Sequence, residues 1–184
     1  LPVGSTMIAT EVSSPFMAPL KLVLYLALLL TMPWLFYQTW TYISPGLKKN
    51  EKKFAGPLML STIILFFSGV CFAFYVVCPI IFKFFIGMAP NSILVLTDIN
   101  QYLNFIFKLV FAFGIAFEIP VATILLVNSG ITTKAYLVKA RPYLIILFLV
   151  IGMLLTPPDI FSQLFLALPM WLLFEIGILI SRDK

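Results

Sequence analysis

An uncharged apolar run from Phe54 to Phe82 constrains this chain more than any other feature. A helix needs roughly 20 consecutive apolar residues to cross the hydrocarbon core of a bilayer. Four further apolar runs recur, at residues 21–40, 102–127, 142–155 and 160–180. With 62% hydrophobic and 10% charged residues, the chain has too little polar surface for a soluble globule. The sequence therefore predicts an all-α polytopic membrane protein, a single domain over residues 1–184 with five transmembrane helices.

The last two apolar runs are separated only by Thr156, Pro157, Pro158 and Asp159, which favours a tight hairpin between antiparallel helices. The fourth run has 14 residues. That is about 21 Å of helix at 1.5 Å per residue, which is short for a core of about 30 Å. We therefore expect a short fourth helix that thins the bilayer locally.

Basic residues orient the predicted helices, because cytoplasmic loops are enriched in Lys and Arg. Alternate loops assign three basic residues to one side and nine to the other. The nine fall in the loops 41–53 and 128–141 and in the C-terminal residues, so we expect these segments, and hence the C-terminus, to be cytoplasmic. Residues 1–20 and 83–101 then form an extracytoplasmic cap and loop, as short interfacial segments.

Five spans with a cytoplasmic C-terminus leave the N-terminal residues outside, without a signal sequence to carry them there. The chain also begins with Leu rather than Met. We therefore expect one further helix upstream, giving six spans with both termini inside.

Several chemistries lack the residues they require. The chain contains no His, which leaves no material for His-based triads or the usual zinc sites. Cys71 and Cys78 lie about two helical turns apart, too far for a disulfide. The basic residues flank apolar runs rather than forming a nucleic-acid patch. We expect no enzyme activity, no metal or other cofactor, and no nucleic-acid partner.

Glu118 is the one ionisable residue that no shift of boundaries moves out of the membrane. Such residues mark functional sites by default. Pro120 strengthens the case, because it removes the hydrogen bond to the Ala116 carbonyl and leaves polar backbone nearby. Three interpretations remain open here: a protonated structural glutamate, a proton-coupled secondary transporter or relay using Glu118, and a functional polar site inside the bundle.

Prolines and aromatic residues add detail to the spans. Kinks are predicted at Pro33, Pro79, Pro120 and Pro169. Aromatic side chains gather near the end of the first span and predict an interfacial belt of Trp34, Tyr37 and Trp40.

Glu51 is a single acid among four lysines in the predicted loop 41–53. Such a carboxylate stays ionised and can bind a guanidinium in fork geometry. The lysines also repel cationic ligands, so binding a pair of arginines would require a second acid from elsewhere.

Four segments resemble TatC, the core subunit of the twin-arginine protein translocase, and occur in the same order. They are GSTMIATEVSSPF at 4–16, YISPGLKKNEKK at 42–53, FAFGIAFEIPV at 111–121 and GMLLTPPDIFSQ at 152–163. The resemblance covers nearly the whole chain. It lacks the N-terminal tail and first helix of the family, where the second acid resides.

The resemblance implies a six-helix, glove-shaped receptor in the bacterial inner membrane that recognises twin-arginine signal peptides of folded proteins. TatA and TatB family proteins are the implied partners, and homo-oligomers are expected within the complex. It implies three groups of site residues: signal-peptide binding by Glu51, Tyr42, Pro45 and Leu47, an intramembrane polar site at Glu118, and TatA or TatB docking at Met153, Thr156 and Gln163, with Asp159 at the outer turn.

Overall fold

The computed structural model describes residues 7–9, 12–43, 49–88, 97–156 and 160–181, and nearly all of them are helical. Five helical stretches in this part of the chain are long and apolar enough to cross a membrane, which confirms the predicted fold class. The elements are β1 (Met7–Ile8), α1 (Ser14–Ile43), α2 (Lys49–Phe72), the π-helix η2 (Ala73–Val77), α3 (Cys78–Met88), β2 (Thr97–Asp98), α4 (Ile99–Ala116), α5 (Ile119–Asn128), α6 (Lys134–Leu155) and α7 (Ile160–Ile180).

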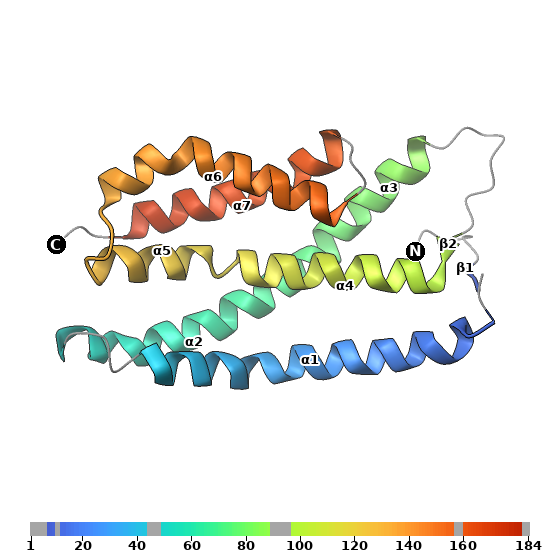
Figure 1. Ribbon diagram of the computed structural model, residues 1–184, viewed down its shortest axis with the longest axis horizontal. Helices are drawn as coiled ribbons and strands as arrows, with labels where there is room; N and C mark the ends of the chain where they lie inside the picture. Colours follow the sequence, from blue (N-terminus) through green and yellow to red (C-terminus); the bar gives the residue numbers. More distant parts are fainter. Residues whose placement is uncertain (1–6, 10–11, 44–48, 89–96, 157–159, 182–184) are drawn as a thin grey trace.

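The stretches run alternately in opposite directions (Figure 1). The pair α4–α5 lies between α1 on one side and the α6–α7 hairpin on the other, while α2–η2–α3 crosses the bundle obliquely. The end at the left of Figure 1, which we call the α1–α2 end, holds the end of α1, the start of α2, the turn between α5 and α6, and the end of α7. The opposite end, where α6 ends and α7 begins, is the α6–α7 end.

The fourth transmembrane helix is longer than the sequence predicted. It begins at Lys134, after Thr133 whose side chain accepts a hydrogen bond from the Tyr136 backbone N–H (3.3 Å) and caps the helix. Its 22 residues correspond to about 33 Å. The prediction of a short fourth helix was wrong, because its first two turns are charged and hydropathy assigned them to the loop 128–141. The argument for bilayer thinning from a 14-residue helix is therefore removed.

Helices also occupy residues that the sequence analysis assigned to the other loops. Helix α1 already begins at Ser14, inside the predicted cap, and α2 begins at Lys49, inside the predicted loop 41–53. Helix α3 extends to Met88, well into the predicted loop 83–101. Both predicted extracytoplasmic segments also contribute a strand, since β1 and β2 pair in parallel, Met7 with Thr97 and Ile8 with Asp98. These two segments are thus joined to each other.

Two of the four predicted kinks coincide with breaks in α-helical geometry. Proline lacks the N–H that would bond the carbonyl four residues earlier. The π-helix η2 ends just before Pro79, and a short turn at Phe117 and Glu118 separates α4 from α5 just before Pro120. Pro33 and Pro169 lie within helices that continue through them.

The core lies along α4–α5. In this stretch 44% of an apolar 18-residue segment is buried, against 11% of such a segment in α1. Phe66 of α2 and Leu109 and Phe113 of α4 are completely enclosed. Gly114 permits this contact, because a Cβ there would lie 2.6 Å from the Phe66 ring. A second cluster joins Ala116 of α4 to the hairpin through Phe148 of α6 and Phe174 of α7.

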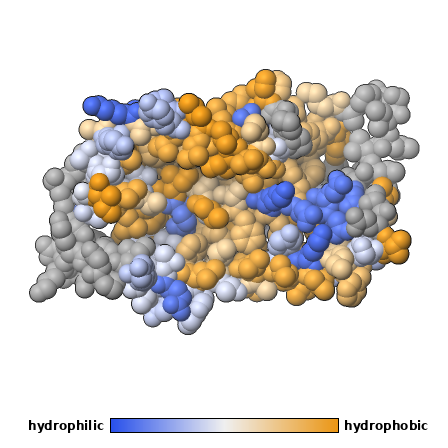
Figure 2. All heavy atoms as spheres, in the orientation of Figure 1, coloured by the Kyte–Doolittle hydropathy of each residue, from blue (hydrophilic) through white to orange (hydrophobic). Residues whose placement is uncertain are grey.

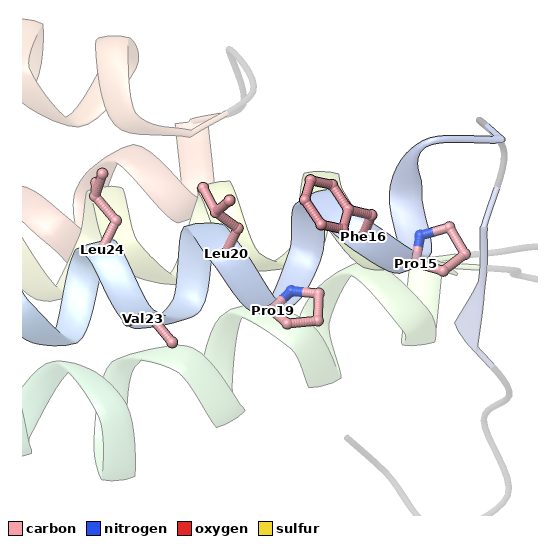
Figure 3. A pocket seen from close by; sticks show the side chains of 6 residues that line it. All are labelled: Pro15, Phe16, Pro19, Leu20, Val23 and Leu24. Carbon is pink, nitrogen blue, oxygen red and sulfur yellow. The ribbon is translucent and has the colours of Figure 1, made fainter.

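Helix α1 exposes apolar side chains along most of its length, as expected for contact with lipid. Hydrophobic residues cover most of the face shown in Figure 2, and hydrophilic ones gather chiefly toward the side where α1 and α4 begin. Near the start of α1 its own side chains form an open apolar hollow on the surface (Figure 3), lined by Pro15, Phe16, Pro19, Leu20, Val23 and Leu24.

Candidate functional site

Glu118 lies at the break between α4 and α5, where the backbone forms a tighter turn than in an α-helix. Its backbone N–H donates to the Ile115 carbonyl (3.0 Å), and its own carbonyl accepts from the Ala122 N–H (2.9 Å). The side chain is half-buried, and its Oε1 atom is enclosed without a hydrogen-bond partner among the described residues. An enclosed carboxyl oxygen of this kind is costly unless it finds a donor. The break at Pro120 thus presents an unsatisfied acceptor within a membrane span.

Two buried side chains on neighbouring helices accompany Glu118. Trp40 near the end of α1 donates from its indole N–H to the Thr62 hydroxyl of α2 (3.2 Å). The Thr62 hydroxyl donates to the Leu58 carbonyl one turn earlier on α2 (3.1 Å), and it also contacts the Glu118 carboxyl. Trp40 is only 6% exposed, so its assignment to the interfacial belt was wrong, whereas Trp34 and Tyr37 are exposed as a belt requires. Sequence alone missed this because the three residues come from three separate segments: α1, α2 and the turn between α4 and α5.

An ion pair joins the two helices of the hairpin toward the α1–α2 end. Arg141 of α6 donates from Nη2 to Glu175 Oε2 of α7 (2.6 Å). The side chains are 41% and 18% exposed. Arg141 falls in the predicted loop 128–141, and the sequence analysis did not single out Glu175 near the end of the last apolar run. The predicted hairpin could have indicated this ion pair, because Arg141 and Glu175 lie at nearly the same distance along the chain from its turn and are therefore brought opposite each other.

The ion pair between Arg141 and Glu175 counts against the proton-coupled transporter considered from the sequence. A proton relay usually uses several titratable groups within the membrane. Glu175, the other acid within a described span, is engaged by Arg141 on a different pair of helices from Thr62 and Glu118. In the part of the chain that the structure covers, no group of three His, Cys, Asp or Glu side chains could hold a metal ion. The two cysteines are free, as their spacing predicted.

The predicted docking residues Met153, Thr156 and Gln163 gather near the α6–α7 end of the hairpin. Thr156 is buried and donates to the Gly152 carbonyl (3.0 Å), and Gln163 donates from Nε2 to the Leu149 carbonyl (2.9 Å). Met153 is 47% exposed. The two polar members therefore hold α6 and its end in place, and Met153 is the member that faces outward.

An apolar groove of about 500 Å³ runs between α5 and the hairpin. Its lining comes from α4, α5, α6 and α7 and is almost entirely hydrocarbon, and it includes Ile119 and Thr123 of α5 and Leu144 and Phe148 of α6. The groove therefore offers an apolar surface large enough to receive the side chains of a further helix or the acyl chain of a lipid.

The predicted signal-peptide residues lie at the α1–α2 end. Tyr42, in the last turn of α1, is 88% exposed. Glu51 lies in the first turn of α2, rather than in a loop as the sequence indicated, and its side chain is outside the described part. Pro45 and Leu47, as well as Asp159 at the hairpin turn, lie outside the described residues. The grouping of these residues as a site stays a prediction.

At the opposite end, polar side chains that the sequence analysis did not single out join α1 to α4. Asn100 donates to the Ser14 hydroxyl (2.7 Å) and accepts from the Lys21 ammonium (3.4 Å). Asp98 caps α4 by accepting from the backbone N–H groups of Asn100 and Gln101. These contacts fix the start of α4 against α1.

Comparison with known proteins gives one consistent match. The family model described as "Sec-independent protein translocase protein (TatC)" matches residues 2–169. A protein of that name from Azotobacter chroococcum is 55% identical over 178 residues, which is 97% of this chain and 70% of the relative. Those from Haemophilus influenzae and Escherichia coli are each 50% identical over 99% of this chain, and the match covers 71% and 70% of their lengths.

Two solved structures share the fold. A crystal structure titled as the twin-arginine translocase receptor TatC superposes with a TM-score of 0.85 at 34% identity, covering 95% of this chain and 77% of that one. A second, titled as the same receptor in DDM, gives a TM-score of 0.88 at 34% identity, covering 97% and 80%.

Proposed function

The chain belongs to the TatC family and is a subunit of the Sec-independent, twin-arginine protein translocase, and we propose that it recognises twin-arginine signal peptides at the α1–α2 end. The proposal rests chiefly on Glu51 in the first turn of α2 and on the exposed Tyr42 in the last turn of α1, nine residues earlier in the sequence. A carboxylate binds a guanidinium through two parallel hydrogen bonds. Pro45 and Leu47 lie between the two elements in sequence and complete the proposed site.

The charge distribution supports a cytoplasmic location for this end in the bacterial inner membrane. Lys134 opens α6, and Lys139 and Arg141 follow within its first turns, at the same end of the bundle as the start of α2 (Figure 1). The positive-inside rule favours the cytoplasm for such an end. The C-terminus follows α7 there, so it is cytoplasmic as well. A signal peptide would meet this face before its cargo crosses.

Export of a reporter carrying a twin-arginine signal tests this function, in cells whose own family member is deleted. We expect Glu51→Gln to reduce export at least tenfold, because one charge-assisted hydrogen bond contributes about 1.5–3 kcal/mol. Lys52→Gln is the matched control, since it changes the neighbouring charge and keeps the carboxylate. Unchanged export by Glu51→Gln, with normal protein level, would count against the proposed site.

TatA and TatB family helices are the proposed partners within the membrane, in complexes that hold several copies of this subunit. Met153 is the outward-facing member of the proposed docking set, and Thr156 and Gln163 shape the hairpin beneath it. Glu118 adds an acceptor that a polar side chain on a partner helix could satisfy. The apolar groove beside α6 gives such a helix further contact area.

Site-specific crosslinking tests the docking surface. A photoreactive residue at Met153 is expected to capture a TatA or TatB family protein in the assembled complex. The same residue at Leu30 of α1, which is 76% exposed, serves as the control for general contact in the membrane. Equal capture at both positions would contradict a docking site on the hairpin.

A further inference from the structure

The side chains around Glu118 include two that no part of the proposed function uses. Trp40 and Thr62 are 6% and 4% exposed, although each carries a polar group. Buried polar groups are normally retained in hydrogen bonds, because leaving one unpaired costs free energy. Their contact with each other and with Glu118 therefore needs a reason beyond packing.

The Thr62 hydroxyl stands at the centre of this group. Its oxygen accepts the indole N–H of Trp40 at 3.2 Å. A hydroxyl has one proton to donate. Two acceptors compete for that proton, the Leu58 carbonyl one turn earlier on α2 (3.1 Å) and the Glu118 carboxyl across the helix interface. With Trp40 occupying one lone pair of the oxygen, the hydroxyl proton is directed toward these two acceptors.

Glu118 has few other restraints. Its Oε1 atom has no hydrogen-bond partner among the described residues, and no ion pair to it occurs there. The carboxyl sits on the short turn before Pro120, where the backbone gives it no capping bond. Thr62 is consequently the side chain of the described part that can fix which way the carboxyl points.

We propose that Trp40 and Thr62 are positioning residues that hold the Glu118 carboxyl in one orientation, with one oxygen held by Thr62 and the other left free for a partner's hydrogen-bond donor. Trp40 acts through Thr62: its N–H fixes the rotamer of the hydroxyl, and the hydroxyl fixes the carboxyl. The inference deepens the proposed function and rests on Glu118 being a contact for a partner helix.

The C=O stretching band of the Glu118 carboxyl group reports this contact directly in the infrared spectrum of the purified full chain, in lipid nanodiscs at a pH at which that group is protonated. The band is identified from the difference between the original protein and Glu118→Gln. Thr62→Val keeps the shape of the side chain and removes the hydroxyl, so the band is expected to shift to higher frequency as the hydrogen bond is lost. Trp40→Phe is expected to broaden or shift it less, in the same direction.

Two further variants separate positioning from packing. Thr62→Ser restores the hydroxyl with one methyl group fewer and is expected to return the band to its original position. Thr39→Val makes the same chemical change next to Trp40, at an exposed threonine that bonds only its own helix at the Leu35 carbonyl, and should leave the band unmoved. A band that stays in place in Thr62→Val, or that moves equally in Thr39→Val, would overturn the inference.

Reporter export by the same variants distinguishes this inference from the proposed function. We expect Thr62→Val to lower export about three- to tenfold, the effect of one hydrogen bond, and Thr62→Ser to restore it. If the band shifts while export by both Thr62→Val and Glu118→Gln stays normal, the positioning contact exists and the role of Glu118 in export is wrong. If export falls in Thr62→Val without a shift of the band, the positioning inference is wrong.

Discussion

The two carboxyl groups within described membrane spans, Glu118 and Glu175, each have an enclosed Oε1 atom without a hydrogen-bond partner, but they differ in whether the other oxygen meets a charged group. Glu175 joins α7 to α6 through an ion pair with Arg141. Glu118 has no ion-pair partner among the described residues, and its carboxyl contacts the neutral hydroxyl of Thr62. A charge that is paired across two helices holds them together, whereas an acid without a charged partner inside a membrane span marks a functional site by default. The contrast supports a structural role for Glu175 and the proposed intermolecular contact for Glu118.

Gly177 connects the two regions, and its substitution should have the largest effect on stability. It lies half a turn beyond Glu175, and a Cβ there would come within 2.9 Å of the Pro120 Cα and 3.0 Å of Thr123 Cβ. Gly177→Ala should force α7 away from α5 and lower the free energy of unfolding by about 1–3 kcal/mol. Thermal unfolding in detergent measures this.

Gly87→Ala is the matched control for that experiment. No atom lies within 4 Å of a Cβ at this position in α3. The change should leave stability the same or raise it by up to about 1 kcal/mol, because Ala favours the helix over Gly. Equal destabilisation by the two substitutions would show that α5 and α7 are not packed closely at Gly177.

Breaking the ion pair should have the next largest effect. Glu175→Gln leaves the Arg141 charge without its partner and should cost about 1–2 kcal/mol, between the values for exposed and buried pairs because Arg141 is 41% exposed. Adding Arg141→Gln to Glu175→Gln removes the unpaired charge and should recover most of the loss. A double-mutant cycle on unfolding free energies gives the coupling, and additive losses would contradict a structural ion pair.

Gln163 should have a smaller effect, since its contact is a single neutral hydrogen bond. Gln163→Met keeps the length of the side chain and removes the donor to the Leu149 carbonyl. We expect a loss of about 0.5–1.5 kcal/mol. Leu164→Met, at a neighbouring position that is 46% exposed, controls for side-chain replacement on α7. A loss no greater than in the control would mean that Gln163 is free for docking.

The sequence predicted the features that composition and proline chemistry determine. The five spans, the hairpin after Leu155 and the break before Pro120 follow from long apolar runs and from the missing N–H of proline. The start of α6 could not be found by hydropathy, because Lys139 and Arg141 are charged and still helical. Helix start signals at Thr133 were the available hint.

The orientation of side chains within a span was harder to predict. In a membrane helix both lipid-facing and bundle-facing residues are apolar, so periodicity does not distinguish the two faces. Trp40 was therefore assigned to the interface, although it is buried against Thr62, and Arg141 was not connected with Glu175. Glu118 was found because an ionisable residue in the middle of a membrane span is unusual whatever its neighbours are.

The comparison of the two acids is tested most directly by export measured per folded molecule. Glu118→Gln and Glu175→Gln make the same change, and the amount of folded protein in the membrane normalises the export of a twin-arginine reporter. We predict that Glu118→Gln keeps stability within about 0.5 kcal/mol and loses export, while Glu175→Gln is less stable and exports normally per folded molecule. Normal export by Glu118→Gln, with a loss by Glu175→Gln that persists after normalisation, would contradict the account.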